Sequence, residues 1–160
     1  MEYPVTQGVR FLRAHNVKFT PYMYRYEEHG GTSVAAGSLN VDEHAVVKTL
    51  VMEDERGEAL IVLMHGDREV STRELARVLG VKTITPCEPD TASRRTGYMV
   101  GGTSPFGTRT SLPVCVESTI FDLPLIYING GKRGFLVGIQ PAELRRVLQV
   151  REVRVARDDP

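Results

Sequence analysis

Val46–Met52 (VVKTLVM) is a run of apolar and β-branched residues, and the polar segment Glu53–Glu58 (EDERGE) separates it from a second apolar run, Ala59–Met64 (ALIVLM). Two such runs joined by a short polar segment that contains a glycine are typical of two antiparallel strands. Side chains alternate between the two faces of a strand, so Lys48 shares one face with Val46, Leu50 and Met52. The sequence therefore predicts a hairpin that carries a lysine inside an apolar strand.

The rest of the chain alternates between predicted helices and predicted strands. Ser71 and Glu74 form a capping box before a helix that ends at Gly80. The other predicted helices are Val5–Leu12, Ser33–Leu39, Asp90–Thr96 and Pro141–Leu148. The other predicted strands are Thr20–Tyr26, with Tyr22, Tyr24 and Tyr26 on one face, Val81–Thr85, Tyr98–Val100, Leu112–Glu117, Leu125–Asn129 and Phe135–Ile139. Because hairpins and crossovers are mixed, we expect an α/β (α+β) fold with a mixed sheet surrounded by helices.

Composition limits the classes of protein to which the chain can belong. The 160 residues are 41% hydrophobic and 25% charged, which is typical of a single globular domain over residues 1–160. The formal net charge is zero, so a polyanion would have to meet a local basic patch. No apolar run approaches the ~20 residues that span a bilayer, and no basic segment followed by an apolar core opens the chain. We therefore expect a cytoplasmic protein without membrane contact.

Several kinds of site have no support in the sequence. The four histidines are widely spaced and lack the spacings of metal ligands. Neither the dinucleotide-binding G-x-G-x-x-G pattern nor the G-x-x-x-x-G-K-[ST] phosphate loop is present. Cys87 and Cys115 are far apart and outside any C-x-x-C motif, which favours reduced thiols. We expect neither a metal nor a cofactor.

Three features remain as candidates for chemistry, each with a structural alternative. Lys48 is either a lysine that protects a strand edge or a cation that stabilises a phosphate or a developing oxyanion. Gly101–Gly107 either offers main-chain N–H groups to a ligand or forms a tight turn. Gly130–Gly134, which contains Lys132 and Arg133, either binds a phosphate or forms a solvated hairpin tip.

Taken together, three strings are more specific than any one alone. They are VKTL at residues 47–50, TGYMVGGTSPFG at 96–107 and YINGGKRG at 127–134. In this order and spacing they closely resemble the YbaK/EbsC-type Cys-tRNA(Pro) deacylases, and the likeness runs over nearly the whole chain. That family belongs to the superfamily of the prolyl-tRNA synthetase editing domain. The resemblance implies the YbaK/prolyl-tRNA synthetase-associated domain fold, a partly barrel-like mixed sheet with helices around it.

The resemblance also implies an activity. The protein would act on the 3′ end of an aminoacyl-tRNA and remove cysteine from mischarged Cys-tRNA(Pro), and also from Cys-tRNA(Cys), in transient association with prolyl-tRNA synthetase. In the mechanism that the family suggests, the thiolate of the substrate cysteine attacks its own ester carbonyl, which makes the enzyme lyase-like and needs no protein nucleophile. Three alternatives stay open. They are a deacylase for another small aminoacyl-tRNA such as alanyl- or seryl-tRNA, a hydrolase in which Lys48 activates Ser104, and a non-catalytic module that binds tRNA or a synthetase.

Finally, the resemblance assigns roles to individual residues. Lys48 matches the family's essential lysine, and Gly101 and Gly102 match the main chain that faces the aminoacyl group. Thr49 and Tyr24 match residues at the family's pocket. With the two glycine-rich loops, the predicted substrate-binding residues are Tyr24, Thr49, Ser104, Asn129, Gly130, Gly131, Lys132 and Arg133. Asn129 departs from the family, whose members often carry serine before the Gly-Gly-Lys-Arg-Gly loop. An amide still donates and accepts hydrogen bonds, so it would alter how the substrate is held rather than abolish activity.

Overall fold

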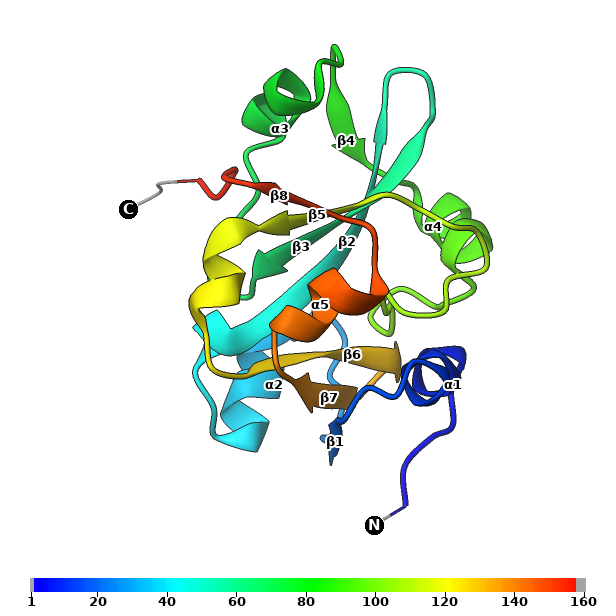
Figure 1. The fold of residues 1–160 in the computed structure, drawn as a ribbon, viewed down its shortest axis with the longest axis vertical. Coiled ribbons are helices and arrows are strands. Elements are labelled where there is room, and N and C mark those ends of the chain that lie inside the picture. The colour runs from blue at the N-terminus through cyan, green and yellow to red at the C-terminus, as the bar shows by residue number, and fades with distance from the viewer. Residues whose placement is uncertain (1, 158–160) are drawn as a thin grey trace.

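The computed structural model describes residues 2–157 and contains one mixed sheet of eight strands (Figure 1). The strands run in the order β1-β7-β6-β2-β3-β5-β8, and β4 pairs with β2 outside this path. Their bounds are β1 Thr20–Met23, β2 Val46–Asp54, β3 Ala59–His65, β4 Ile84–Pro86, β5 Val114–Glu117, β6 Ile126–Lys132, β7 Phe135–Ile139 and β8 Val150–Val153. The expected mixed sheet is confirmed, because β2 pairs antiparallel with β3 and parallel with β6.

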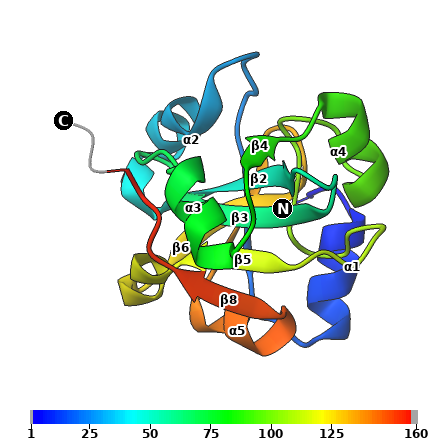
Figure 2. The same cartoon turned by 90° about the horizontal axis from the view of Figure 1, so that it is seen from above.

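Helices surround this sheet and agree with the sequence patterns to within a few residues. They are α1 Gln7–Ala14, α2 Gly31–Leu39, α3 Thr72–Leu79, α4 Pro89–Thr96 and α5 Ala142–Val147, with 3-10 turns η1 Glu43–Ala45 and η2 Ser118–Asp122. The predicted ends of α3 are confirmed, since the Ser71 hydroxyl accepts the Glu74 N–H and Gly80 ends α3 with φ of 71°. The second half of the capping box is wrong, because the Glu74 carboxylate binds Arg77 and the Ser71 N–H donates to the Val155 carbonyl. Figure 2 shows α2 and α5 on opposite sides of the sheet.

The predicted hairpin lies at the centre of the fold and carries a core on each face. β2 and β3 pair from Val47 opposite His65 to Glu53 opposite Ala59. One core packs Leu63 against Phe106, Phe135 and helices α1 and α5. The other packs Met64 against α3. Because both faces are covered, every residue of β3 is buried, which explains its unbroken apolar run.

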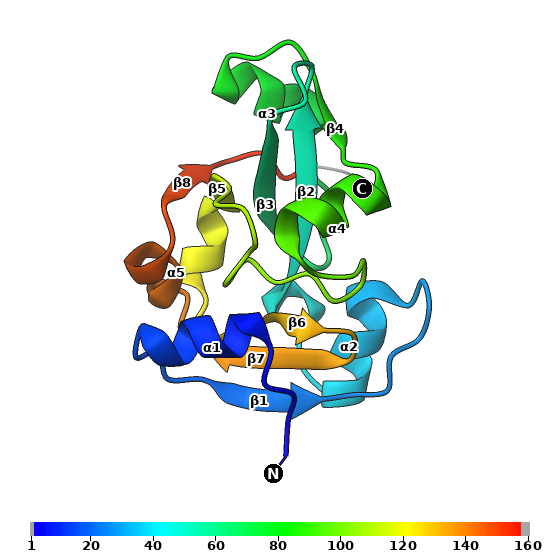
Figure 3. The same ribbon diagram turned by 90° about the vertical axis from the view of Figure 1, so that its right-hand side faces the viewer.

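β2 has a gap in its pairing on the side opposite β3. It pairs with β6 only at Val46 and Val47, and with β4 only from Met52 onward, so residues 48–51 have no strand neighbour there. The cause lies in β6, which bulges between Asn129 and Lys132. Figure 3 shows β6, β7 and β1 running at a steep angle to β2 and β3, so the sheet curls strongly.

Three predicted elements are wrong in position or type. Tyr98–Val100 is not a strand, because Tyr98 is buried and its hydroxyl donates to the Phe106 carbonyl, which folds this segment into a turn. β1 ends at Met23, so Tyr24 and Tyr26 lie in the following loop rather than on a strand face. The strand predicted at Val81–Thr85 begins only at Ile84.

One strand of the sheet was not predicted. β8 is four residues long and pairs parallel with β5. Its sequence, VREV, is too short and too polar to signal a strand by itself.

A substitution at Gly130 tests whether the β6–β7 hairpin leaves room for a side chain at this position. A Cβ at this position would lie 2.4 Å from the buried Phe135 ring. We therefore expect Gly130→Ala to lower the free energy of unfolding by about 1–3 kcal/mol, the usual cost of overpacking a core. Urea denaturation measures the change. The control is Gly37→Ala in α2, where an added Cβ meets no atom within 4 Å, and which we expect to stabilise the protein by up to about 1 kcal/mol. Equal stability of both variants would contradict the packing.

Candidate functional site

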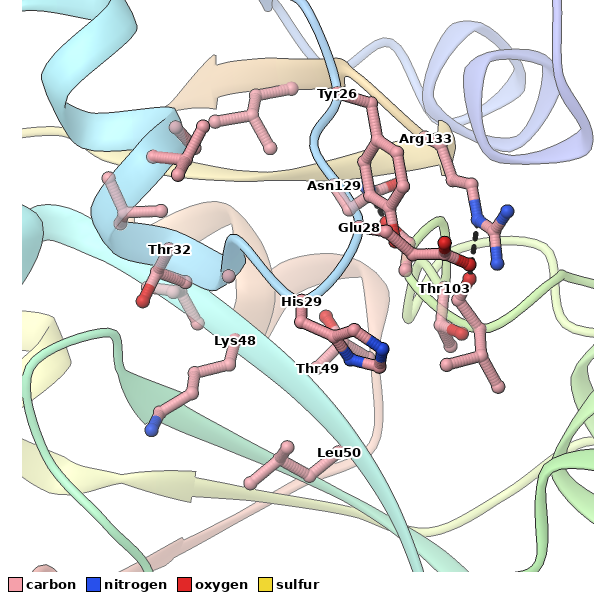
Figure 4. A pocket seen from close by; sticks show the side chains of 18 of the residues that line it. Tyr26, Glu28, His29, Thr32, Lys48, Thr49, Leu50, Thr103, Asn129 and Arg133 are labelled. Carbon is pink, nitrogen blue, oxygen red and sulfur yellow. Dashed lines mark hydrogen bonds between the residues drawn. The ribbon is translucent and has the colours of Figure 1, made fainter.

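A cavity of about 630 Å³ opens beside the unpaired part of β2 (Figure 4). One wall is β2 itself, residues 46–51, and the opposite wall is the loop from Tyr24 to the first turns of α2. The remaining wall residues are Cys87, Pro89 and Ala92 at α4, Val100, Gly101 and Thr103 in the following loop, and Asn129, Arg133 and Leu136 from the β6–β7 hairpin. Six of the predicted site residues line this cavity: Tyr24, Lys48, Thr49, Gly101, Asn129 and Arg133.

Lys48 lies in the cavity wall on the face of β2 that carries α3. Its Nζ donates to Glu69 Oε1 at 3.1 Å, and the lysine side chain is 18% exposed whereas the Glu69 side chain is 69% exposed. An ion pair with so exposed a partner contributes little to stability. An anionic ligand can therefore replace Glu69 beside Lys48 with little loss of stability.

Thr49 follows on the opposite face of β2, as strand alternation requires. It lines the cavity, yet its hydroxyl oxygen is buried and has no hydrogen-bond partner among the described residues. Buried hydroxyl groups in proteins are normally hydrogen-bonded. The Thr49 hydroxyl is therefore unsatisfied at the wall of the cavity.

Gly101 brings main chain to the cavity in a conformation that suits glycine. Its φ is 89°, and an added Cβ would lie 2.5 Å from the Tyr26 hydroxyl. The Gly101 carbonyl accepts from Asn129 Nδ2 at 3.3 Å. The position of this peptide is therefore fixed by close packing on one side and by a side-chain amide on the other.

Both polar atoms of the Asn129 side-chain amide form hydrogen bonds with main-chain groups of the neighbouring loops. Oδ1 accepts the N–H groups of Gly131 at 2.6 Å and Lys132 at 3.1 Å. Nδ2 donates to the carbonyls of Gly101 at 3.3 Å and Lys132 at 3.2 Å. A serine has one donor and cannot make both Nδ2 bonds. Asn129 therefore fastens the bulge of β6 to the Gly101 loop, although it also lines the cavity.

Arg133 joins three segments at the cavity rim. Its Nε donates to the Val100 carbonyl at 2.8 Å, and its guanidinium lies 5.0 Å from the centroid of the Tyr26 ring. The hairpin, the glycine-rich loop and the loop after β1 are thereby held together. In Figure 4 the Arg133 and Tyr26 side chains lie together on one side of the cavity.

Tyr24 lines the cavity from the loop after β1. Its N–H donates to the Gly134 carbonyl at 2.9 Å. Burial raises the pKa of the Tyr24 hydroxyl, and the neighbouring Tyr26 adds to this shift. The hydroxyl is therefore neutral near pH 7 and can donate a hydrogen bond.

Gly102 and Ser104 do not line the cavity. Ser104 is fully buried, and its hydroxyl accepts the Phe106 N–H at 3.1 Å. This bond shapes the turn. Gly102 donates its N–H to the Met99 carbonyl at 2.8 Å and packs against the main chain of Lys132 and Arg133. Neither residue contributes to the cavity wall.

Three residues of the β6–β7 hairpin also lie outside the cavity lining, namely Gly130, Gly131 and Lys132. Gly130 packs on Phe135, and Gly131 packs on Tyr98. Lys132 is exposed and does not line the cavity. These residues bring the hairpin close to its neighbours, which is why glycine recurs there.

Sequence reasoning missed several residues of the cavity wall, namely Tyr26, Glu27, Glu28, His29, Thr32 and Cys87. Most lie in the loop between β1 and α2, which carries no motif. The Thr32 hydroxyl donates to Glu43 Oε2 at 2.8 Å and anchors the start of α2. Burial raises the pKa of the Cys87 thiol, and Glu53 adds to the shift. That thiol is therefore protonated near neutral pH.

Residues 2–157 contain no cluster of three His, Cys, Asp or Glu side chains able to hold a metal ion. None of the helices in that range combines the length and the apolar character needed to cross a bilayer.

Comparison with solved structures supports the same fold. A structure described as a proposed trans-editing enzyme for prolyl tRNA synthetase is 20% identical, with a TM-score of 0.83 over 97% of this chain and 99% of that one. The hypothetical protein APE2540 is 22% identical, with a TM-score of 0.86 over 95% of this chain and 100% of the other. At these identities the likeness establishes the fold.

Sequence comparison identifies the family. EbsC of Enterococcus faecalis, named for a proposed Cys-tRNA(Pro)/Cys-tRNA(Cys) deacylase activity, is 26% identical over 85% of this chain and 84% of its own length. A proline–tRNA ligase of Desulfotalea psychrophila is 28% identical over 95% of this chain, which corresponds to 27% of that enzyme. Residues 27–147 match the model of the aminoacyl-tRNA editing domain. The chain is therefore a member of the aminoacyl-tRNA editing domain family, of the YbaK/EbsC type.

Proposed function

We propose that this protein is a trans-acting deacylase that removes cysteine from mischarged Cys-tRNA(Pro), and also from Cys-tRNA(Cys), by attack of the substrate's own thiolate. The observation that carries the proposal is the cavity that holds Lys48 and the fixed Gly101 peptide together. The family supports an aminoacyl-tRNA substrate. The likeness to EbsC and to prolyl-tRNA synthetases supports cysteine as cargo and prolyl-tRNA synthetase as a transient partner.

The proposed step is intramolecular. The cysteine thiol loses its proton, its sulfur forms a bond to the ester carbonyl carbon, and the bond to the ribose oxygen then breaks. That oxygen takes up a proton, so the products are free tRNA and a cyclised cysteine. The Lys48 ammonium stabilises the negative charge that develops on the carbonyl oxygen, and the wall around Gly101 holds the ester in a reactive orientation.

The lining of the cavity supports a substrate nucleophile over a protein nucleophile. Cys87 is a wall residue, but burial raises the pKa of its thiol, and a protonated thiol is a poor nucleophile. Ser104 is buried behind the turn that it shapes. Lys48 is paired with Glu69 rather than with a hydroxyl group.

Lys48→Ala tests the role of the cation. We expect the variant to fold normally and to lose Cys-tRNA(Pro) deacylation by about 100-fold or more, because removing one stabiliser of transition-state charge has this scale of effect. The assay compares Cys-tRNA(Pro), Ala-tRNA(Pro), Pro-tRNA(Pro) and Cys-tRNA(Cys). The matched control is Glu69→Gln, which keeps Lys48 and removes the negative charge of its partner, and which we expect to remain active. A fully active Lys48→Ala protein would refute the proposal. Activity of the wild type on alanyl but not cysteinyl esters would instead assign another cargo.

The source of the nucleophile has its own test. We expect Cys87→Ala and Ser104→Ala to keep deacylation within about threefold of the wild type, since neither side chain attacks the ester. Ser-tRNA(Pro), in which oxygen replaces the substrate sulfur, should react at least about 100-fold more slowly than Cys-tRNA(Pro), because a hydroxyl is far less ionised than a thiol at neutral pH. Loss of turnover in either variant, or equal rates for the two esters, would point to a protein nucleophile.

A further inference from the structure

The gap in β2 exposes main-chain hydrogen-bonding groups to the cavity. The Val46 carbonyl accepts from Gly66 at 2.6 Å, just beyond β3, whereas the Val51 carbonyl accepts from Cys87 at 3.0 Å, just beyond β4. Carbonyl groups two residues apart along a strand point to the same side. The N–H and C=O of Thr49 therefore point away from β3, into the part of β2 that has no strand neighbour.

This opening is one residue long. Val47 pairs with Ile128 of β6 at one end, and the Val51 carbonyl is taken by Cys87 at the other. Thr49 lies between Val47 and Val51, and its main-chain N–H and C=O point to the same side of β2 as theirs. A peptide strand would need several consecutive residues with unpaired main-chain groups, and the gap is too short for that. A ligand that carries one donor and one acceptor at the spacing of a single residue does fit.

An independent observation also indicates a ligand at Thr49. Its hydroxyl is buried without a hydrogen-bond partner in the described chain, and the residue lines the cavity. A buried hydroxyl that stays without a hydrogen-bond partner destabilises the folded state, and a ligand that supplies the partner removes this cost. Thr49 thus has hydrogen-bonding groups available to a ligand in both its main chain and its side chain.

Resting on the proposed function, we propose that the aminoacyl group pairs with Thr49 as one residue of an added antiparallel strand would. The α-ammonium donates to the Thr49 carbonyl, and the carbonyl oxygen of the ester accepts from the Thr49 N–H. An aminoacyl ester carries both groups on one carbon, as a peptide residue does, and directly opposed residues in an antiparallel pair exchange these two bonds.

This pairing fixes where the rest of the substrate lies. Opposed residues of an antiparallel pair place their side chains on the same face. The cargo side chain therefore lies on the face of Thr49, and Lys48 approaches the ester from the other face. The pairing also makes a free α-amino group a requirement, so the site distinguishes an aminoacyl-tRNA from a tRNA whose amino acid is blocked at nitrogen.

Binding of stable analogues tests the pairing without any turnover. The ligands are adenosines in which an amide at the 3′ position carries cysteine or its deamino counterpart, 3-mercaptopropionate. We expect the cysteinyl analogue to bind at least about tenfold more tightly and to shift the Thr49 amide resonance in a ¹⁵N NMR spectrum. The Leu50 N–H, which faces β3, should move less and serves as the internal control. Equal affinity for the two analogues, or an unmoved Thr49 amide, would overturn the pairing.

Thr49→Val separates main chain from side chain, because it removes the hydroxyl and keeps the N–H and C=O. We expect the tenfold preference for the cysteinyl analogue to persist in this variant, as in the control Thr85→Val, which changes an exposed residue of β4. Loss of the preference in Thr49→Val alone would assign the ammonium to the hydroxyl and overturn the pairing. The proposed function is assayed separately, by cleavage of Cys-tRNA(Pro). Tight binding without cleavage would refute the deacylase and leave the pairing in place.

Discussion

The site depends on one constraint, which is that β2 cannot be paired along its whole length. Asn129 binds the N–H groups of Gly131 and Lys132 and so holds β6 in a bulge. β6 consequently leaves β2 after Val47, and β4 joins β2 only at Met52. The cavity fills the space between, with Lys48 on one face of the strand and Thr49 on the other.

The glycines around the site serve mainly to bring main chains together. Gly102 lies against the backbone of Lys132 and Arg133, and Gly107 lies against that of Gln7 and Gly8. Gly101 differs, since it lines the cavity and its peptide is held by Asn129. A glycine-rich string can thus be typical of a family although most of its glycines support the site from behind.

The sequence could predict the elements with strong local signals. The N-cap of α3 and the β2–β3 hairpin could be predicted because caps and unbroken apolar runs are local patterns. The strings around Lys48 and Gly101 both contribute residues to the wall of one cavity. What could not be predicted depends on long-range contacts: the side of its loop on which Ser104 lies, the two carbonyls that Asn129 binds, and the pairing of β8 with β5. The loop from Tyr26 to His29 carries no motif, so its place on the cavity wall emerged only from the fold.

The pairing of Lys48 with an exposed Glu69 has a consequence for selectivity against small ions. In the resting protein the lysine cation is already neutralised, so inorganic phosphate, sulfate and free nucleotides have to compete with a tethered carboxylate that is always present. A tethered group acts at a high effective concentration and cannot diffuse away. Because Glu69 is exposed, this competition is weak, and it lowers the affinity of every anion for Lys48 by a modest factor. A ligand that contacts only Lys48 is therefore disfavoured relative to one that also contacts the rest of the cavity wall.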